Sequence, residues 1–128
     1  MKVLLDTHAV AWWLLDSGRL TRKSHAVIAD PHNEIWVSSV SAFEMATKFR
    51  IGKWPNIGGL VQNFESAIKA ENFLLLSINA AHAAHGGMMA SPHRDPFDRL
   101  LAAQAILDGM MLVTNDPVFK VFGVEVLW

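Results

Sequence analysis

Four acidic residues stand in the sequence at positions from which their side chains could act together. Asp6 directly follows the apolar run Val3–Leu5, which predicts a strand buried on both faces. Asp116 follows another short apolar run, while Glu44 and Asp98 stand near the starts of two predicted helices. In a parallel α/β sheet, strand ends and the first turns of the following helices share one edge, so we expect these carboxylates to converge.

Four carboxylates in one cleft predict a bound cation. They would repel one another, and some would take up a proton unless a cation neutralised them. Oxygen ligands in a chain without cysteine suit a hard divalent ion, Mg²⁺ or Mn²⁺, rather than zinc. Magnesium held by a few carboxylates and several waters is typical of enzymes that act on phosphate groups.

Several of these acids also have a purely structural alternative. Asp6 could cap the helix that follows it, with Thr7 beside it. Glu44 precedes Lys48 by four residues, the favourable orientation for an exposed ion pair on a helix. Asp116 could be a turn residue before the proline that follows it. Each alternative is plausible alone, but together they leave the shared positioning of the acids unexplained.

The third acid is ambiguous between Asp95 and Asp98. Asp95 precedes Pro96, a pattern that predicts a helix N-cap with proline at the first helical position. Asp98 would lie in the first turn, where a negative charge favours the helix dipole whatever its function. Capping is the favoured role for Asp95, and both residues stay candidates at this point.

The predicted elements that would position these acids alternate along the chain. Apolar runs predict strands at 3–5, 34–37, 73–76 and 111–113, with an edge strand at 124–127. Helices are predicted over 8–15, 20–29, 40–50, 60–70, 79–89 and 96–107, with a short turn over 117–120. This order predicts one α/β domain over residues 1–128, a three-layer sandwich with a mostly parallel sheet of four to five strands.

The composition excludes several classes of protein. With 128 residues, 52% of them hydrophobic and 18% charged, the chain is too apolar for a disordered linker and long enough for one core. The absence of cysteine excludes a disulfide framework and fits a reducing, cytoplasmic location. No apolar run approaches membrane-spanning length. A net charge of −1 means that any polyanion would have to bind to local basic patches.

Four segments together resemble PIN-domain ribonucleases of the VapC toxin type. They are Val3-Leu-Leu-Asp-Thr-His, Ser38-Ser-Val-Ser-Ala-Phe-Glu-Met-Ala, Asp95-Pro-Phe-Asp-Arg-Leu-Leu-Ala-Ala-Gln-Ala and Leu112-Val-Thr-Asn-Asp-Pro. They span nearly the whole chain in the family's order and spacing. The resemblance implies an α/β/α sandwich whose acidic cluster binds Mg²⁺ or Mn²⁺ and cleaves RNA to a 5′-phosphate and a 3′-hydroxyl.

Carried over residue by residue, the resemblance assigns the metal and catalytic site to Asp6, Glu44, Asp98 and Asp116. Asp98 matches the acid before the Leu-Leu-Ala-Ala run better than Asp95 does. Asp116 matches a position that varies in the family, and Asn115 competes with it. Asp6, Asp98 and Asp116 would hold the metal, and Glu44 would position the attacking water or a second ion.

Other side chains are candidates for supporting roles. Thr7, Thr114 and Asn115 could orient ligands or waters. RNA binding draws most of its affinity from phosphate contacts, which require positive charge. The candidate contacts are the basic residues Arg19, Arg22, Lys23, Lys48, Arg94 and Arg99, with Arg50 and Lys53 near Lys48. Each of them also fits a solvated surface.

Aromatic and imidazole side chains carry weaker indications. Trp12 and Trp13 could stack on bases, although core packing or a partner interface is favoured for both. His8 and His93 are close in sequence to the acids and could contact substrate. His82 and His85, which share a face of a predicted helix, are expected to have surface or packing roles.

The resemblance further implies the toxin of a type II toxin–antitoxin system, held inactive by a cognate antitoxin that covers the cleft. Such toxins commonly homodimerise, which would cover some of the apolar surface that 52% hydrophobic residues and five tryptophans suggest. One alternative is a PIN-like scaffold that binds RNA or protein without cutting. A phosphate-accepting regulatory domain is disfavoured, because the third predicted strand ends at Leu76-Ser77 without an aspartate.

Overall fold

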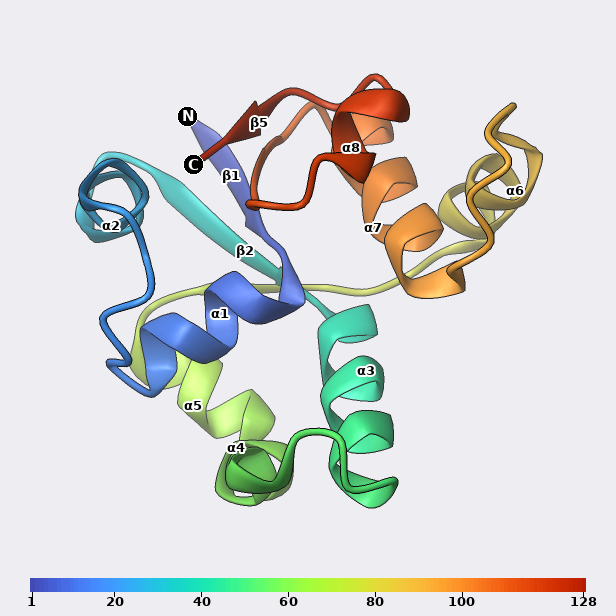
Figure 1. Cartoon of the computed structure of the whole chain (residues 1–128). Helices are drawn as coiled ribbons and strands as arrows, with labels where there is room; N and C mark the ends of the chain where they lie inside the picture. The colour runs from blue at the N-terminus through green and yellow to red at the C-terminus, as the bar shows by residue number, and fades with distance from the viewer.

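Strand β1 (Lys2–Leu5) is the central strand of a five-stranded sheet in the computed structural model, which describes residues 1–128 (Figure 1). The strand order is β3-β2-β1-β4-β5, and every neighbouring pair is parallel. The other strands are β2 (Glu34–Ser38), β3 (Leu74–Leu76), β4 (Met111–Val113) and β5 (Val126–Leu127). The predicted parallel sheet with a fifth strand at its edge is therefore confirmed.

The apolar run of β1 is buried on both faces of the sheet. Val3, Leu4 and Leu5 are each 0% exposed. Because successive side chains of a strand point to opposite faces, Val3 and Leu5 belong to one hydrophobic cluster and Leu4 to the other. Two cores, one on each face, account for the three layers that the alternation of elements predicts.

Helices cover both faces of the sheet (Figure 1). Helices α1 (Thr7–Leu14), α2 (Arg22–Ala29) and α5 (Phe64–Ala70) pack on one face, and α7 (Pro96–Leu107) and α8 (Val118–Val121) on the other. Helix α3 (Ser39–Arg50) contributes Met45 to one core and Val40 to the other. Helix α6 (Ala80–Met88) packs along α7.

The prediction of a single helix over 60–70 is wrong. The structure has a 3₁₀ turn η1 (Pro55–Ile57), then α4 (Gly58–Gln62), and α5 begins only after Asn63. The Asn63 side chain donates to the Gly59 carbonyl at 3.1 Å, and such a local bond competes with the continuing helix. The predicted turn over 117–120 is also different, since it forms the one-turn helix α8.

A buried polar contact ties the start of α3 to α7. Ser38 caps α3 by accepting the Val40 N–H at 3.0 Å, and its hydroxyl donates to Gln104 Oε1 at 2.6 Å. Both Ser38 and Gln104 are fully buried. This contact fixes the start of α3, which carries Glu44, against the later turns of α7, the helix that carries Asp98. None of the helices has the length and apolar character needed to cross a lipid bilayer.

Candidate metal and active site

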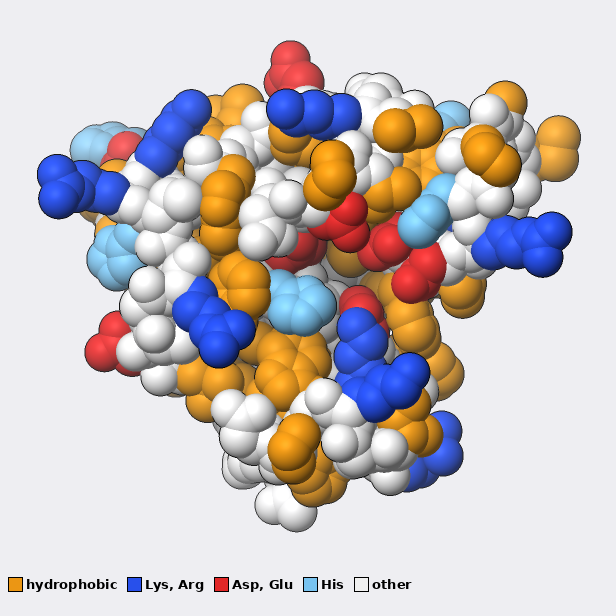
Figure 2. Space-filling model, in the orientation of Figure 1, with side chains coloured by type: hydrophobic (Ala, Val, Ile, Leu, Met, Phe, Trp, Pro, Cys, Tyr) orange, Lys and Arg blue, Asp and Glu red, His pale blue; other side chains and the backbone are white.

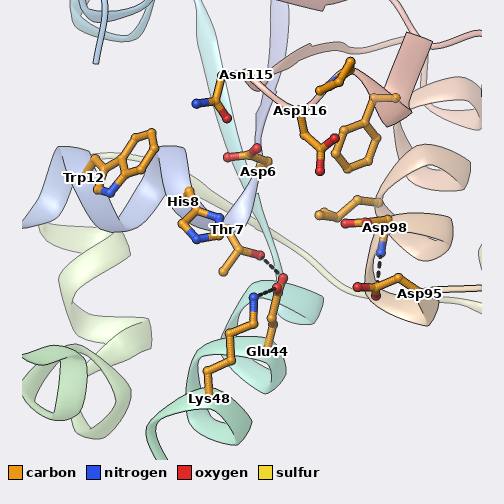
Figure 3. Close-up of a pocket in the computed structure, with 13 residues that line it drawn as sticks. Asp6, Thr7, His8, Trp12, Glu44, Lys48, Asp95, Asp98, Asn115 and Asp116 are labelled. Atoms are coloured by element: carbon orange, nitrogen blue, oxygen red, sulfur yellow. Dashed lines mark hydrogen bonds and ion pairs between the residues drawn. The ribbon is translucent and has the colours of Figure 1, made fainter. Parts of the chain in front are cut away.

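A cleft of about 480 Å³ opens where β1 and β4 end and where α3 and α7 begin. Asp6, Glu44, Asp98 and Asp116 all line it, together with Thr7, Lys48, Asp95 and Asn115 (Figure 3). Figure 2 shows the carboxylates gathered in a hollow near the middle of this face, with Lys, Arg, His and hydrophobic side chains around it. The four acids that were predicted to converge from their positions in the sequence therefore line one cleft in the structure.

Asp6 is both the N-cap of α1 and a wall of the cleft. Its carboxylate accepts the Ala9 N–H at 2.7 Å, and the residue is only 6% exposed. Burial raises the pKa of Asp6 to about 6, hydrogen bonds from Thr114 and Ala9 lower it, and the charges of Glu44 and Asp116 raise it. Capping and site formation are therefore two roles of one side chain.

Glu44 is held on both carboxylate oxygens. Thr7 Oγ1 donates to Glu44 Oε1 at 2.6 Å, and Lys48 Nζ donates to Glu44 Oε2 at 2.6 Å (Figure 3). The Thr7 hydroxyl also lies 3.1 Å from Ser41 Oγ. The predicted ion pair of Glu44 with Lys48 is present, but it lies in the wall of the cleft, with the Glu44 side chain only 7% exposed.

Asp95 and Asp98 have different contacts at the start of α7. Asp95 Oδ1 accepts the backbone N–H of Phe97 at 2.8 Å and of Asp98 at 3.4 Å, so the predicted cap is confirmed. Asp98 Oδ2 pairs with His93 Nε2 at 2.8 Å. Burial raises the pKa of Asp98, the His93 contact lowers it, and the charges of Asp95, Asp116 and Glu44 raise it. Ligand atoms of His93, Asp95 and Asp98 lie within 4.8 Å of one another.

Asp116 follows β4 in a tight turn that begins α8. Its N–H donates to Thr114 Oγ1 at 3.0 Å, and its Oδ1 accepts the Val118 N–H at 3.0 Å. Asp116 therefore has the turn role that was the structural alternative to a place in the site. Thr114 is buried, whereas Asn115 and Asp116 face the cleft (Figure 3).

This arrangement fits a hard divalent cation. Its donors are carboxylate oxygens, and one oxygen each of Asp95, Asp98 and Asp116 accepts no hydrogen bond from the protein. The raised pKa values of Asp6 and Asp98 reflect burial and mutual repulsion, both of which a cation relieves. Glu44 differs, because both of its oxygens are already occupied.

Comparison with known proteins places the chain in a family. Residues 3–125 match the PIN domain family. The chain belongs to the PIN-domain family. Ribonuclease VapC22 of Mycobacterium tuberculosis is 32% identical to this PIN domain over 118 residues, which cover 89% of the chain and 86% of that protein.

Solved structures share the PIN fold over nearly the whole chain. VapBC2 from Rickettsia felis, bound to a DNA fragment from its promoter, aligns with a TM-score of 0.65 and 18% identity over 99% of this chain and 98% of that one. FitAcB from Neisseria gonorrhoeae gives a TM-score of 0.65 with 19% identity, covering 98% and 96%. A toxin–antitoxin complex from Klebsiella pneumoniae gives 0.64 with 21% identity, also covering 98% and 96%. At these identities the likeness shows the fold alone.

Arg99 of this PIN domain is not free to contact a phosphate, which corrects its place among the RNA contacts. Its guanidinium donates to the backbone carbonyls of Gly86, Gly87, Met89, Ser91 and His93 at 2.6–3.4 Å. These contacts use all five of its N–H groups. Arg99 instead holds the end of α6 and the loop that leads to α7.

The other basic residues predicted to contact RNA lie at different distances from the cleft. Lys48 lines the cleft, and the Arg19 guanidinium carbon lies 5.9 Å from the centre of the Trp12 ring, beside it. Lys23 lines a neighbouring hollow. Arg22 and Arg94 are exposed and line neither space.

Ser41 belongs to the site but was not among the residues predicted from the sequence. Ser41 is fully buried and contacts the Thr7 hydroxyl, which holds Glu44. The available signal was its spacing, since a residue three positions before Glu44 shares its helix face. The packing role expected for the histidine at 82 is confirmed, because His82 is buried and pairs with Asp108 at 2.9 Å.

Proposed function

We propose that this PIN domain is a divalent-metal-dependent endoribonuclease and the toxin of a type II toxin–antitoxin pair. The observation that carries the proposal is the convergence of four carboxylates from separate elements in one cleft, two of them with raised pKa values. The sequence identity with Ribonuclease VapC22 supports RNA as the substrate class.

In the proposed mechanism, each side chain has a separate task. Asp6, Asp98 and Asp116 would hold the cation, with Asp95 as the alternative to Asp98. When bound, a divalent cation lowers the pKa of a water and offsets the charge that develops on the phosphate. Glu44, held by its hydrogen bonds, orients the attacking water. His93 fixes the rotamer of Asp98 through their 2.8 Å contact. Hydrolysis leaves a 5′-phosphate and a 3′-hydroxyl.

The test is the loss of intact RNA under defined metal conditions. The purified protein is incubated with total RNA in Mg²⁺, in Mn²⁺, or in EDTA. We expect cleavage with either ion, none in EDTA, and recovery when excess Mg²⁺ is added back. Cleavage that persists in EDTA rejects the metal-dependent mechanism. A protein that binds RNA but cleaves under none of these conditions supports the non-cleaving scaffold instead.

Replacing Thr7 by Val should lower kcat for RNA cleavage by about tenfold, the lower end of the loss typical for a side chain that orients an active-site group. The Thr7 hydroxyl donates to Glu44 Oε1 at 2.6 Å, and valine keeps the shape without the donor. Thr7→Ser keeps the hydroxyl and should cleave at close to the parent rate. A Thr7→Val variant that cleaves as fast as Thr7→Ser contradicts the role of Thr7 in positioning Glu44.

The proposed partners are an antitoxin and a second copy of the chain, acting on RNA in the cytoplasm. The solved VapBC and toxin–antitoxin complexes that share this fold support an antitoxin. Phe43 is 65% exposed, Met88 84% and Val121 70%, which leaves apolar surface for a partner. Light scattering of the purified chain tests the homodimer, and copurification with the product of an adjacent gene tests the antitoxin.

A further inference from the structure

Four aromatic rings contact one another beside the acidic cleft, and two of them, His8 and Trp12, line it. His8 stacks on Trp54 with ring centres 4.8 Å apart and an angle of 24° between the planes. Trp12 lies 5.5 Å from His8 and 5.7 Å from Trp128. We name these residues, His8, Trp12, Trp54 and Trp128, the aromatic strip. Figure 3 shows His8 and Trp12 on α1, on the side of the cleft opposite Asp95 and Asp98.

Trp12 is set apart from the other tryptophans by what it contacts. Of the five in the chain, it alone packs against neither hydrophobic core, although its neighbour Trp13 packs against one and contacts Phe73. Trp12 is half-buried and lines the cleft. Core packing therefore does not explain this large ring on the rim of the cleft.

Basic side chains follow the aromatic strip. Arg19 lies 5.9 Å from the centre of the Trp12 ring, within reach of a cation–π contact. A second hollow of about 330 Å³ shares Asn115 and Asp116 with the cleft. Lys23, Lys120 and Trp128 also line this second hollow. The strip thus continues from the cleft into a space that carries positive charge, in a protein whose net charge is −1.

We propose that the aromatic strip is a base-stacking subsite for single-stranded RNA, with Trp12 as its central platform. The inference rests on the proposed ribonuclease function and adds the form of RNA that the site takes. Stacked aromatic rings beside cations are how proteins hold unpaired bases and their phosphates together. A duplex keeps its bases inside, so it could not use these rings. Arg19 beside Trp12, and Lys23 and Lys120 in the hollow that Trp128 lines, favour a polyanion over an apolar peptide.

The test is binding of a fluorescein-labelled, unstructured ten-nucleotide RNA, measured by anisotropy in an Asp98→Asn background that slows cleavage. Trp12→Leu should weaken binding about 5- to 100-fold, the range expected for loss of one base-stacking contact. Trp12→Phe should restore most of it. Phe43→Leu is the matched control, because Phe43 is an exposed aromatic residue that does not line the cleft.

Two further measurements separate stacking from a change in structure. A ten-nucleotide RNA with abasic ribose at every position should bind weakly, and with equal affinity, to the parent protein and to Trp12→Leu. The salt dependence of binding should be unchanged in Trp12→Leu. Arg19→Gln should make the negative slope of log K against log salt shallower by about 0.7, because one phosphate contact is lost. Equal losses for the base-bearing and abasic chains would overturn the stacking role.

The outcomes also separate this inference from the proposed function. If the parent cleaves RNA and Trp12→Leu keeps the parent affinity and KM, the stacking subsite is rejected and the ribonuclease stands. That result would assign the aromatic strip to a protein contact. If the parent neither binds nor cleaves RNA, the proposed function itself is rejected.

Discussion

Asp98→Asn is expected to lower kcat for RNA cleavage by about 10²- to 10³-fold, the loss typical when one charged group is removed from an active site. Asp95→Asn is expected to stay within about tenfold of the parent. We expect the difference because asparagine also performs the capping task of Asp95, whereas Asp98 lies among the other acids, where burial and the charges of Asp95, Asp116 and Glu44 raise its pKa. The measurement is the single-turnover rate on an RNA oligomer at saturating Mg²⁺.

The two variants form a matched pair, because both replace an aspartate by asparagine at the start of α7, one at the N-cap and one in the first turn. Thermal unfolding of each shows whether the helix start is intact. Isothermal titration with Mn²⁺ gives a readout independent of activity, and only Asp98→Asn should abolish binding. If Asp95→Asn alone abolishes both cleavage and Mn²⁺ binding, Asp95 is the third ligand and our assignment of Asp98 is wrong.

Asp6→Asn should stabilise the metal-free protein by up to about 3 kcal/mol at pH 7, because it removes a buried charge. This value corresponds to the rise of the Asp6 pKa from its ordinary 3.8 to about 6. Asparagine retains the N-cap of α1. For a domain of this size, we expect a rise in Tm on the order of 10 °C in EDTA. Mg²⁺ should raise the Tm of the parent and leave that of the variant nearly unchanged.

The stabilisation has a defined pH dependence. The folded-state pKa of Asp6 lies above its unfolded value, so below pH 3.8 the carboxyl is protonated in both states and has no effect on relative stability. The penalty grows as the pH rises from 3.8 to about 6 and is complete above that. The Tm difference between variant and parent in EDTA should therefore vanish toward pH 4 (about the unfolded pKa). Asp16→Asn, at an exposed position outside the cleft, controls for a general charge effect. A variant that is less stable than the parent at pH 7 contradicts the prediction.

Much of the site could be predicted because it depends on strand ends. Asp6 follows β1 and Asp116 follows β4, and these adjacent parallel strands bring the two residues to one edge of the sheet. Glu44 follows the same logic, because α3 directly follows β2, whereas Asp98 lies in the first turn of α7, which the chain reaches through α6 and a loop. The alternatives raised from sequence did not compete with the site, since Asp6 caps a helix and Glu44 pairs with Lys48 while both line the cleft.

What could not be predicted depends on contacts between segments far apart in the chain. Arg99 directly follows Asp98 in the sequence, yet its guanidinium donates hydrogen bonds to carbonyls near the end of α6 and in the following loop. No local sequence pattern predicts the path of that loop. Trp12 and Trp13 are neighbours of the same type, and only the packing around α1 shows that one enters a core and the other does not. The helix break at Asn63 was missed because an amide bond to Gly59 competes with helix continuation there.

The Arg99 side chain holds the end of α6 and the loop between α6 and α7, and this determines how the loop can move. Five carbonyls from Gly86, near the end of α6, to His93 accept hydrogen bonds from the Arg99 guanidinium, so this one side chain, together with the His93–Asp98 contact, ties the segment to α7. A segment held in this way opens as one cooperative unit. The same opening would withdraw His93 from Asp98. Local unfolding of this loop and disassembly of that side of the cleft are therefore one equilibrium.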